Sequence, residues 1–570
     1  MKDFVRLGGA QIGEFSIVYS KDEPEPVLHA AEEIAKYVSI LYETEPLPIY
    51  TDKNKIAEKT IILGDLTGLP KPEGEEAYII VCDKNRSQIL IQGANPRGII
   101  YGSYAFLEEI CTWRFISPDI EYNKIAEGRT EPYEIGNKKI EWNPIIEWRD
   151  VASPIYWNDA VSIKRRLNSS YNRHCHSTWG GTYEYPGRFI HTFESLLGVP
   201  QHTQPCLSDP TVLEKCINSV RELLRQNPNA RVISVSQNDC DIDEKTYCTC
   251  PKCAKIDEEE GSHAGTLLRF VNKVAEAVEE EFPKCKIMTL AYIHTIKIPK
   301  ITRPHKNVII EFAPINMDFG HSVRSEGNRA TLKDFEDWST IADRIFVWDY
   351  QVNFSFSVPH FPNFKLLRDN MKYYVDHNVK GFFMEGDNHS EYRTATDMGE
   401  YKAYLLANLL CNPYMSDSCY RTVCEDFLYG FYGKKGYLLT DYLDILGELA
   451  EKNPHPLGIF ENPNTMYDKE KFLAKLPEME AIWNEVETGA ENEFQRENVT
   501  RSRLGYTYLK LLYGFDLFCQ SGEPFKSAIL KENENFYKTI TAIGTPPRGI
   551  GTKVPELTDM SENMGIKIYW

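Results

Sequence analysis

Three polar residues, Gln237 to Asp239, directly follow a short strand-like run in which Val232, Ile233 and Val235 are apolar and β-branched. An amphipathic helical pattern, Pro210 to Gln226, precedes this run. In (β/α) barrels, amides and carboxyls at the carboxyl ends of strands bind ligands and transfer protons. The alternative is an ordinary turn, because Asn and Asp are common turn residues after a strand. The pattern leaves both interpretations open.

Three cysteines, Cys248, Cys250 and Cys253, follow in the next stretch of chain. Their thiolates are zinc ligands, and Cys240 or His263 would complete a tetrahedral set. The Cys-x-Cys spacing is unusual for a zinc knuckle, and no second Cys-x-x-Cys follows downstream. We therefore expect a structural clip on the loop after Asp239, made by a metal or by packed thiols. Catalytic zinc is disfavoured, and no other cofactor is indicated.

The elements that must position these residues form an alternating pattern. From residue 141 to 400, strand-like runs alternate with helical stretches, as in parallel βαβ units. Eight polar strand ends match the number that a closed (β/α)8 barrel needs, although an open sheet would give the same strings. They are Arg149-Asp150, Asn172 to His174, Gln204 to Asp209, Gln237 to Asp239, Tyr292, Glu311 to Asn316, Trp348 to Tyr350 and Glu385 to Asp387.

Two further regions flank the predicted barrel. Residues 1–125 resemble a small α/β domain, with three strand-like runs and two helices, Pro26 to Tyr42 and Ile99 to Cys111. Glu121 to Ile140 is charged and short of apolar residues, which predicts a linker. Residues 401–570 show helical periodicity and end in an irregular tail from Thr545. The predicted fold class is therefore α/β: a small α/β domain, a TIM-like barrel and an α-helical C-terminal domain.

Composition narrows the class of partner. The chain has 570 residues, of which 42% are hydrophobic and 26% charged, as expected for a folded chain of several domains. A formal charge of −19 argues against nucleic acid or an anionic membrane, since both require a basic surface. No apolar run is long enough to span a bilayer. Aromatic residues make up 12%, which suits a cleft lined with flat rings.

The N-terminal residues, Met1 to Gly9, lack an apolar signal core. The chain as written is therefore expected in the cytoplasm, or in the periplasm or outside the cell if a leader has been removed. Its 14 cysteines are scattered, and most lie among apolar residues, which is typical of buried, reduced thiols.

Six strings stand out: Ser234 to Asp239, Tyr247 to Cys253, Gly265 to Asn272, Thr289 to Tyr292, Trp348 to Tyr350 and Glu400 to Leu410. Together they closely resemble the bacterial domain catalogued as DUF4838. That domain is associated with glycoside hydrolase family 163, endo-β-N-acetylglucosaminidases acting on N-glycans. Arg97 to Glu108 is similar to the non-catalytic α/β domain that precedes family 20 hexosaminidase and family 67 α-glucuronidase barrels. The resemblance covers most of residues 20–415.

This resemblance implies a retaining glycosidase that cleaves a glycan containing β-linked N-acetylglucosamine and uses the substrate's acetamido group as nucleophile. One polar group orients the acetamide, and a second protonates the leaving oxygen and later activates water. The resemblance gives these roles to Asn238 and Asp239. The acid needs a raised pKa, hence partial burial beside a negative charge. Asp241, Asp243 and Glu244 are competing carboxylates, interpreted as solvated loop charges.

If the substrate does not assist, two carboxyls must flank the bond, about 5–5.5 Å apart for retention or about 6.5–9.5 Å for inversion. Asp349 and Glu385 are then the predicted partners of Asp239. The alternative for Asp349 is a salt bridge, and for Glu385 a contact to a sugar hydroxyl.

Aromatic and polar residues at the other strand ends are predicted to bind the substrate, an oligosaccharide or glycan, since sugars stack on flat rings. They are Arg149, Asn172, His174, Trp179, Gln237, Tyr292, Trp348 and Tyr350. Two rival functions stay open. One is an α-glucuronidase-like enzyme, with Arg149, Arg173 or His174 binding the uronate. The other is a non-catalytic carbohydrate-binding protein.

Overall fold

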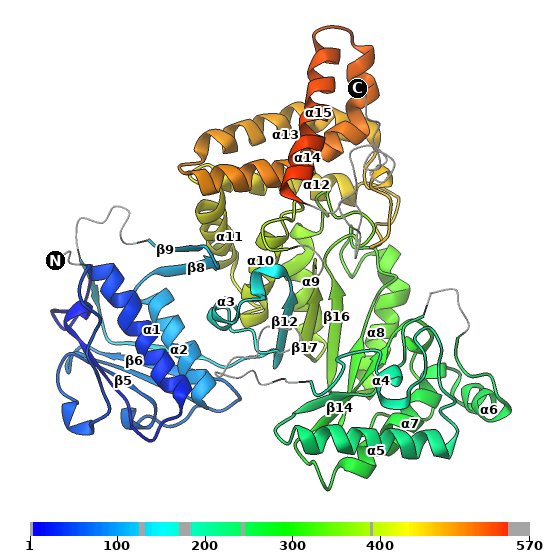
Figure 1. The fold of residues 1–570 in the computed structure, drawn as a ribbon, viewed down its shortest axis with the longest axis horizontal. Coiled ribbons are helices and arrows are strands. Elements are labelled where there is room, and N and C mark those ends of the chain that lie inside the picture. Colours follow the sequence, from blue (N-terminus) through cyan, green and yellow to red (C-terminus); the bar gives the residue numbers. More distant parts are fainter. Residues whose placement is uncertain are drawn as a thin grey trace. The chain divides into compact units, whose positions relative to one another are not determined.

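The computed structural model describes residues 4–124, 132–169, 183, 185–240, 246–387 and 391–544. It is a mixed α/β protein whose internal contacts divide it into two compact units, both drawn in Figure 1. The first unit comprises Met1–Glu147, Trp157–Asn168 and Arg173–Gly181, and the second comprises Trp148–Tyr156, Ser169–Asn172 and Thr182–Trp570.

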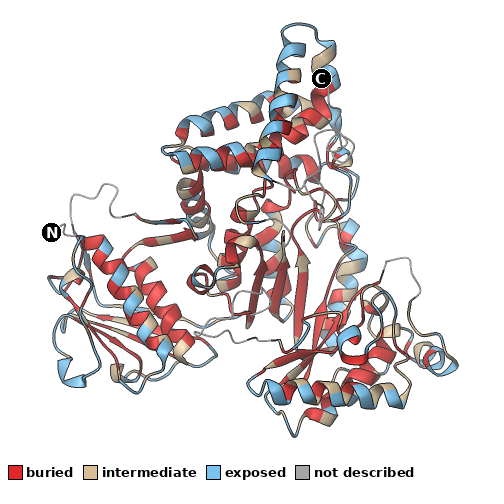
Figure 2. Cartoon of the chain, in the orientation of Figure 1, coloured by how far each residue is buried: buried red, intermediate tan, exposed pale blue. Residues whose placement is uncertain are grey.

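A mixed six-stranded sheet forms the centre of the first unit, in the order β11-β6-β7-β5-β3-β4. Helices α1 (Glu25–Tyr42) and α2 (Pro96–Glu109) pack on each other, and α2 also packs on β6 and β7. Figure 2 shows the buried faces of both helices. The strands of this sheet are β3 (Ser16–Val18), β4 (Ile49–Tyr50), β5 (Thr60–Leu63), β6 (Tyr78–Asp83), β7 (Gln88–Gly93) and β11 (Lys138–Trp142).

Smaller elements complete the first unit, and they include part of the predicted linker. The sheet β10-β1-β2 and the hairpin β8-β9 add short strands. The linker predicted over Glu121 to Ile140 is wrong for its described residues, because β10 lies within it and β11 begins there. The remaining elements are β1 (Val5–Leu7), β2 (Ala10–Gln11), β8 (Trp113–Ser117), β9 (Ile120–Asn123), β10 (Tyr133–Ile135) and α3 (Asp159–Lys164).

The second unit is built on a curled parallel sheet of six strands, in the order β12-β17-β16-β15-β14-β13. From β13 to β17 sequential strands are neighbours, and β12, the first strand of the set, pairs with β17, the last, as in a (β/α) barrel. The described residues therefore form a half-barrel with six of the eight predicted strands. These are β12 (Trp148–Ala152), β13 (Val232–Ser234), β14 (Lys286–Ala291), β15 (Val308–Phe312), β16 (Ile345–Tyr350) and β17 (Val379–Glu385).

Two predicted strands are not among these six. One would end at Asn172 to His174, which lies outside the described residues. The other would end at Gln204 to Asp209, but that segment is a loop between α4 and α5. Pro200 and Pro205 lie in or beside this segment, and proline cannot donate to a strand ladder.

Helices cover the outer face of the half-barrel: α7 packs on β14 and β15, α9 on β17, and α10 on β12. Among the helices after α10, α13 packs between α12 and α14, and both α11 and α15 pack on α14. None of the described helices combines the length and the apolar character needed to cross a membrane. Their bounds are α4 (Phe193–Leu197), α5 (Pro210–Gln226), α6 (Pro251–Glu260), α7 (His263–Val278), α8 (Arg329–Ile341), α9 (Leu367–Asp376), α10 (Gly399–Cys411), α11 (Asp417–Tyr432), α12 (Leu439–Glu451), α13 (Lys469–Gly489), α14 (Glu493–Gln520) and α15 (Phe525–Ile543).

The strands of the half-barrel present alternate side chains to two faces. On the outer face, Phe312 meets Phe335 of α8 with ring centroids 5.5 Å apart. On the inner face, aromatic rings from different strands meet, with Trp148 5.0 Å from Phe346 and Trp348 4.3 Å from Phe383. This alternation assigns each residue at a strand end either to the barrel interior or to the helix layer.

Candidate active site

Asp239 lies just beyond β13, at the carboxyl end of the half-barrel. Its side chain is 45% exposed, and its Oδ1 accepts hydrogen bonds from the Tyr292 hydroxyl (3.3 Å) and from the backbone N–H of Cys240 (3.0 Å). The Nε2 of His191 lies 3.7 Å from the same oxygen. The His191 Nδ1 contacts the carbonyl oxygen of Gln237 at 2.8 Å, which fixes the ring. Asp239 is therefore an accessible carboxyl held from three directions.

Glu385 is the last residue of β17 and belongs to the inner face, like Trp348 on the neighbouring strand. The indole Nε1–H of Trp348 donates to Glu385 Oε2 at 2.6 Å. The pKa of Glu385 is raised to about 8, mainly by burial; the Trp348 hydrogen bond acts against the shift and the charge of Asp239 acts with it. Glu385 therefore retains a proton at neutral pH, and the residue is only partly buried.

Two tyrosines, Tyr292 and Tyr350, lie close to the two carboxyls. Burial raises the pKa of Tyr350 well above its usual value, and the charges of Glu385 and Asp239 add to the effect. Burial also raises the pKa of Tyr292, with Asp239 next in effect. Both phenols are therefore protonated donors at neutral pH. Asp239 and Glu385 both contribute to the raised pKa of each phenol, so the two carboxyls lie near the same pair of rings.

Two deeper acids, Asp150 on β12 and Glu311 on β15, also belong to the inner face. Glu311 is fully buried, and neither of its carboxyl oxygens has a hydrogen-bond partner among the described residues. Burial raises its pKa well above 4.5, and the charges of Asp150 and Glu385 act in the same direction. Burial raises the pKa of Asp150 to about 7, against a hydrogen bond from Ser169. Sequence reasoning placed both at strand ends without naming them as site residues.

Asn238 has a structural environment that differs from its predicted role. Its side chain is fully buried, and its amide Nδ2 donates to the carbonyl oxygens of Val199 (3.2 Å), Pro200 (3.1 Å) and Thr203 (3.0 Å). Its Oδ1 accepts from the N–H of Glu194 at 2.9 Å. The amide is therefore occupied in fastening the loop before α5, and no polar atom is left to orient an acetamide.

Asp349 lies on the outer face, opposite Trp348 and Tyr350 on the same strand. Its carboxyl accepts from Gln351 Nε2 at 2.9 Å and from the N–H of Tyr350 at 3.0 Å. Burial raises its pKa to about 7, and its charge acts on Tyr374 of α9. The structure therefore does not bring Asp349 together with Asp239, because strand alternation turns it toward the helices.

Only some of the predicted substrate-binding residues lie at the site. Arg149 is fully buried and alternates with the inward-facing Trp148 and Asp150, so it lies on the outer face. Gln237 is buried and donates to Thr295 Oγ1 and the Tyr292 carbonyl, both at 2.9 Å. Tyr292, Trp348 and Tyr350 are brought to the site. Asn172, His174 and Trp179 lie outside the described residues, as do Asp241, Asp243 and Glu244.

A pocket of about 410 Å³ lies beside the strand ends. Ala152, Gln351 and Asp387, which end or follow β12, β16 and β17, line it together with Glu400 and Lys402 of α10. Lys402 Nζ donates to the Gln351 carbonyl at 2.7 Å, and burial lowers its pKa to about 7. The surface of the pocket is mainly apolar, and the pocket begins immediately after Glu385.

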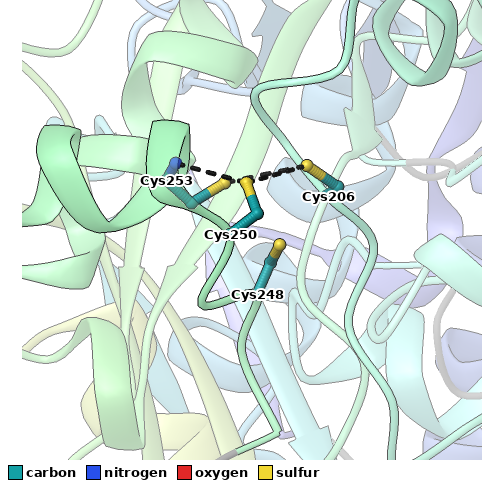
Figure 3. A group of neighbouring side chains, drawn as sticks. All are labelled: Cys206, Cys248, Cys250 and Cys253. Carbon is teal, nitrogen blue, oxygen red and sulfur yellow. Dashed lines mark hydrogen bonds between the residues drawn. The ribbon is translucent and has the colours of Figure 1, made fainter.

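The cysteine cluster is the other feature that the sequence predicted. Cys248, Cys250 and Cys253 lie together, and the fourth thiol beside them is Cys206. Figure 3 shows the four sulfur atoms between the loop of Cys206 and the start of α6. Neither residue expected to complete the set lies there: Cys240 Sγ is 3.7 Å from His294 Nδ1, and His263 Nδ1 is 2.7 Å from an Asp257 oxygen.

The arrangement has a definite chemical capability. A partly exposed carboxyl that keeps its proton at neutral pH can protonate a leaving group. A second carboxyl beside it, surrounded by donors, can accept a proton or face a developing positive charge. Two such acids at the carboxyl end of a parallel barrel suit the cleavage of an acid-labile bond.

Comparison with known proteins places this geometry in context. The family described as "Domain of unknown function (DUF4838)" matches residues 113–444. No curated protein matches the chain. Among solved structures, a GH138 enzyme targeting pectin rhamnogalacturonan II is 10% identical with a TM-score of 0.50, covering 97% of this chain and 98% of its own. A 4-O-methyl-α-glucuronidase of family GH115, with specificity for decorated arabinogalactans, is 12% identical with a TM-score of 0.54, covering 95% and 77%. Both are glycoside hydrolases, and at these identities the similarity shows a shared fold.

Proposed function

This chain belongs to the DUF4838 family, and we propose that it is a glycoside hydrolase acting at the carboxyl end of its half-barrel. The observation that supports the proposal most directly is the arrangement of two carboxyls at neighbouring aromatic residues: the Tyr292 hydroxyl donates to Asp239, and the Trp348 indole N–H donates to Glu385. The fold shared with two glycoside hydrolases supports the same class of reaction.

In this proposal Glu385 is the general acid. Its proton passes to the glycosidic oxygen as the bond between that oxygen and the anomeric carbon breaks. Trp348 holds the carboxyl in place through its indole N–H. The resemblance implied Asp239 as the acid; we assign that role to Glu385, because its pKa is raised to about 8 and Trp348 holds its carboxyl.

Asp239 is the second carboxyl and faces the positive charge that develops on the sugar. For a substrate with β-linked N-acetylglucosamine, as the sequence resemblance implies, Asp239 would accept the acetamide N–H and stabilise the oxazolinium. It then takes the role that was predicted for Asn238, whose amide is occupied by the loop before α5. Tyr292 and His191 keep Asp239 oriented toward the cleft.

The test is hydrolysis of a panel: aryl β-N-acetylglucosaminides, aryl glucuronides and a released complex N-glycan. Glu385→Gln and Asp239→Asn are expected to slow cleavage by roughly two or more orders of magnitude. Asp349→Asn is the matched control, because it removes a buried acid with a raised pKa from the outer face of the same strand region. Its rate is expected to stay within a few-fold of wild type.

Each result of the panel has a distinct meaning. Cleavage of glucuronides alone would keep the glycosidase and replace the N-acetylglucosamine substrate with a uronide. Glycan binding without cleavage of any member would contradict the proposal and favour a carbohydrate-binding protein. Full activity of Glu385→Gln would refute the assignment of the acid.

A further inference from the structure

Four sulfur atoms converge beside the proposed active site, from parts of the chain that are far apart in sequence. The Sγ atoms of Cys206, Cys248, Cys250 and Cys253 all lie within 4.8 Å of one another. Cys206 belongs to the loop before α5, Cys248 to the loop after Asp239, and Cys250 and Cys253 to the N-terminal end of α6. This arrangement is not used by the proposed hydrolysis.

The distances match the edges of a metal-centred tetrahedron. Zinc–sulfur bonds of about 2.3 Å in tetrahedral geometry place neighbouring sulfur atoms about 3.8 Å apart. The Cys206 Sγ lies 3.7 Å from that of Cys250 and 3.8 Å from that of Cys253. A disulfide would need about 2.05 Å between two of these atoms. The spacing therefore suits four ligands around one ion.

We propose that Cys206, Cys248, Cys250 and Cys253 bind one structural zinc ion. Four thiolates close the coordination sphere, so the ion has no open position for water and takes no part in catalysis. The proposal stands apart from the glycosidase assignment, because it rests on the cysteine geometry alone.

The surroundings provide the second shell that thiolate sites use. The Cys253 N–H donates to Cys250 Sγ at 3.5 Å, as the N-cap contact of α6. The Ser208 hydroxyl lies 3.2 Å from Cys253 Sγ and 3.4 Å from Cys206 Sγ. A backbone N–H offsets the negative charge of a thiolate and orients it toward a metal, and once the thiols are ionised the Ser208 hydroxyl can donate to one of its two sulfur neighbours.

The consequence of the site is to fasten two loops that flank Asp239. The loop that contains Cys206 is bonded to Asn238: Gln204 Nε2 donates to the Asn238 carbonyl at 2.7 Å, and Asn238 N–H donates to Gln204 Oε1 at 3.2 Å. The second ligand, Cys248, lies nine residues after Asp239 in the sequence. The ion would therefore join the loop of Cys206 to the chain that follows Asp239, close to the residues that position the Asp239 carboxyl.

The experiment measures metal in the full-length protein purified with reductant and without chelator or affinity tag. Elemental analysis is expected to give about one zinc per chain. Cys206→Ser is expected to reduce the zinc content to near zero, since three ligands no longer close the site. Cys240→Ser and Cys419→Ser, which change thiols outside the cluster, are expected to keep the full zinc content.

A second measurement covers the case in which Cys206→Ser fails to fold. Wild-type protein produced with cobalt in place of zinc is expected to show strong sulfur-to-cobalt charge-transfer absorption and intense visible bands, the signature of tetrahedral thiolate coordination. Wild-type protein without metal, and without uptake of added zinc or cobalt, would overturn the proposal. So would cysteines of the cluster that resist alkylation until a reductant is added, because that result indicates disulfides.

Discussion

The alkaline limb of the pH–activity profile is the sharpest consequence of the contact between Trp348 and Glu385. The indole N–H donates to the carboxyl at 2.6 Å, and this hydrogen bond favours the ionised form and therefore lowers the pKa of Glu385. Trp348→Phe keeps an aromatic ring on the inner face and removes the donor together with part of the ring volume. The pKa of Glu385 is then expected to rise from its value of about 8.

The size of this pKa change follows from the strength of the hydrogen bond between Trp348 and Glu385. A hydrogen bond to a charged group is worth about 1.5–3 kcal/mol, and one pKa unit corresponds to about 1.4 kcal/mol. Loss of the bond therefore raises the pKa by roughly one to two units, to about 9–10. Because the acid must be protonated to act, activity at pH 9 relative to pH 7 is expected to rise from about one tenth in wild type to about one half or more in Trp348→Phe.

The assay is kcat/KM against pH for the best substrate of the panel, which reports the pKa of the acid in the free enzyme. Trp338→Phe is the matched control, since its buried indole N–H donates to the carbonyl of Ile296 and to no carboxyl. Its alkaline limb is expected to coincide with that of wild type. An alkaline limb that stays in place or moves to lower pH in Trp348→Phe would refute the reasoning.

Three further substitutions test the structure through stability. Glu311→Gln is expected to raise the melting temperature at pH 7, because the wild-type carboxyl must hold a proton in the folded state that it releases on unfolding. Near pH 4 the unfolded carboxyl is also largely protonated, so the advantage of the variant should disappear. Equal shifts of the melting temperature at both pH values would contradict this. Asn238→Ala is expected to cost about 3 kcal/mol by loss of its buried hydrogen bonds, seen as a lower denaturant midpoint, whereas Asn227→Ala at an exposed position should cost about 0.5 kcal/mol or less. Arg501→Met leaves the buried carboxylate of Glu400 without its partner at 2.6 Å and is expected to lower the free energy of unfolding by about 3–5 kcal/mol. Arg329→Met, which breaks an exposed ion pair with Glu326, should lower it by less than about 1 kcal/mol.

Much of the secondary structure could be predicted from periodicity. The helix predicted from Pro210 to Gln226 has those bounds in the structure, because its apolar positions form one stripe and Asp209 caps its first turn. The edge strand β11 was missed for the opposite reason. At the edge of the sheet it pairs with β6, and its two apolar residues, Ile140 and Trp142, pack against the core but alternate with the exposed Lys139 and Glu141, so its sequence shows no apolar run.

The candidate site could be predicted only in part. Asp239 and Glu385 both follow apolar strand runs, which is a local signal. Glu311 could have been found as the one charge in the apolar run Val308–Phe312, and strand alternation would have separated Asp349 from Trp348. The structural role of Asn238 could not be predicted, because its amide bonds to carbonyls of a loop that no local sequence pattern links to it. Cys206 was missed for the same reason, as a single cysteine has no spacing to interpret.

The inner-face acids are ordered by depth, and this order explains how one of them becomes a proton donor. Glu311 and Asp150 are sealed, Glu385 is partly exposed, and Asp239 is open to solvent. Like charges in a low-dielectric interior cannot all ionise, so the inner acids hold protons while Asp239 faces the charge of the substrate. Glu385 is the only one of the four that combines a retained proton with partial exposure. A fully buried acid without access to a substrate would cost stability and do no chemistry. The position of Glu385 between the two extremes is therefore the physical reason for assigning it the acid.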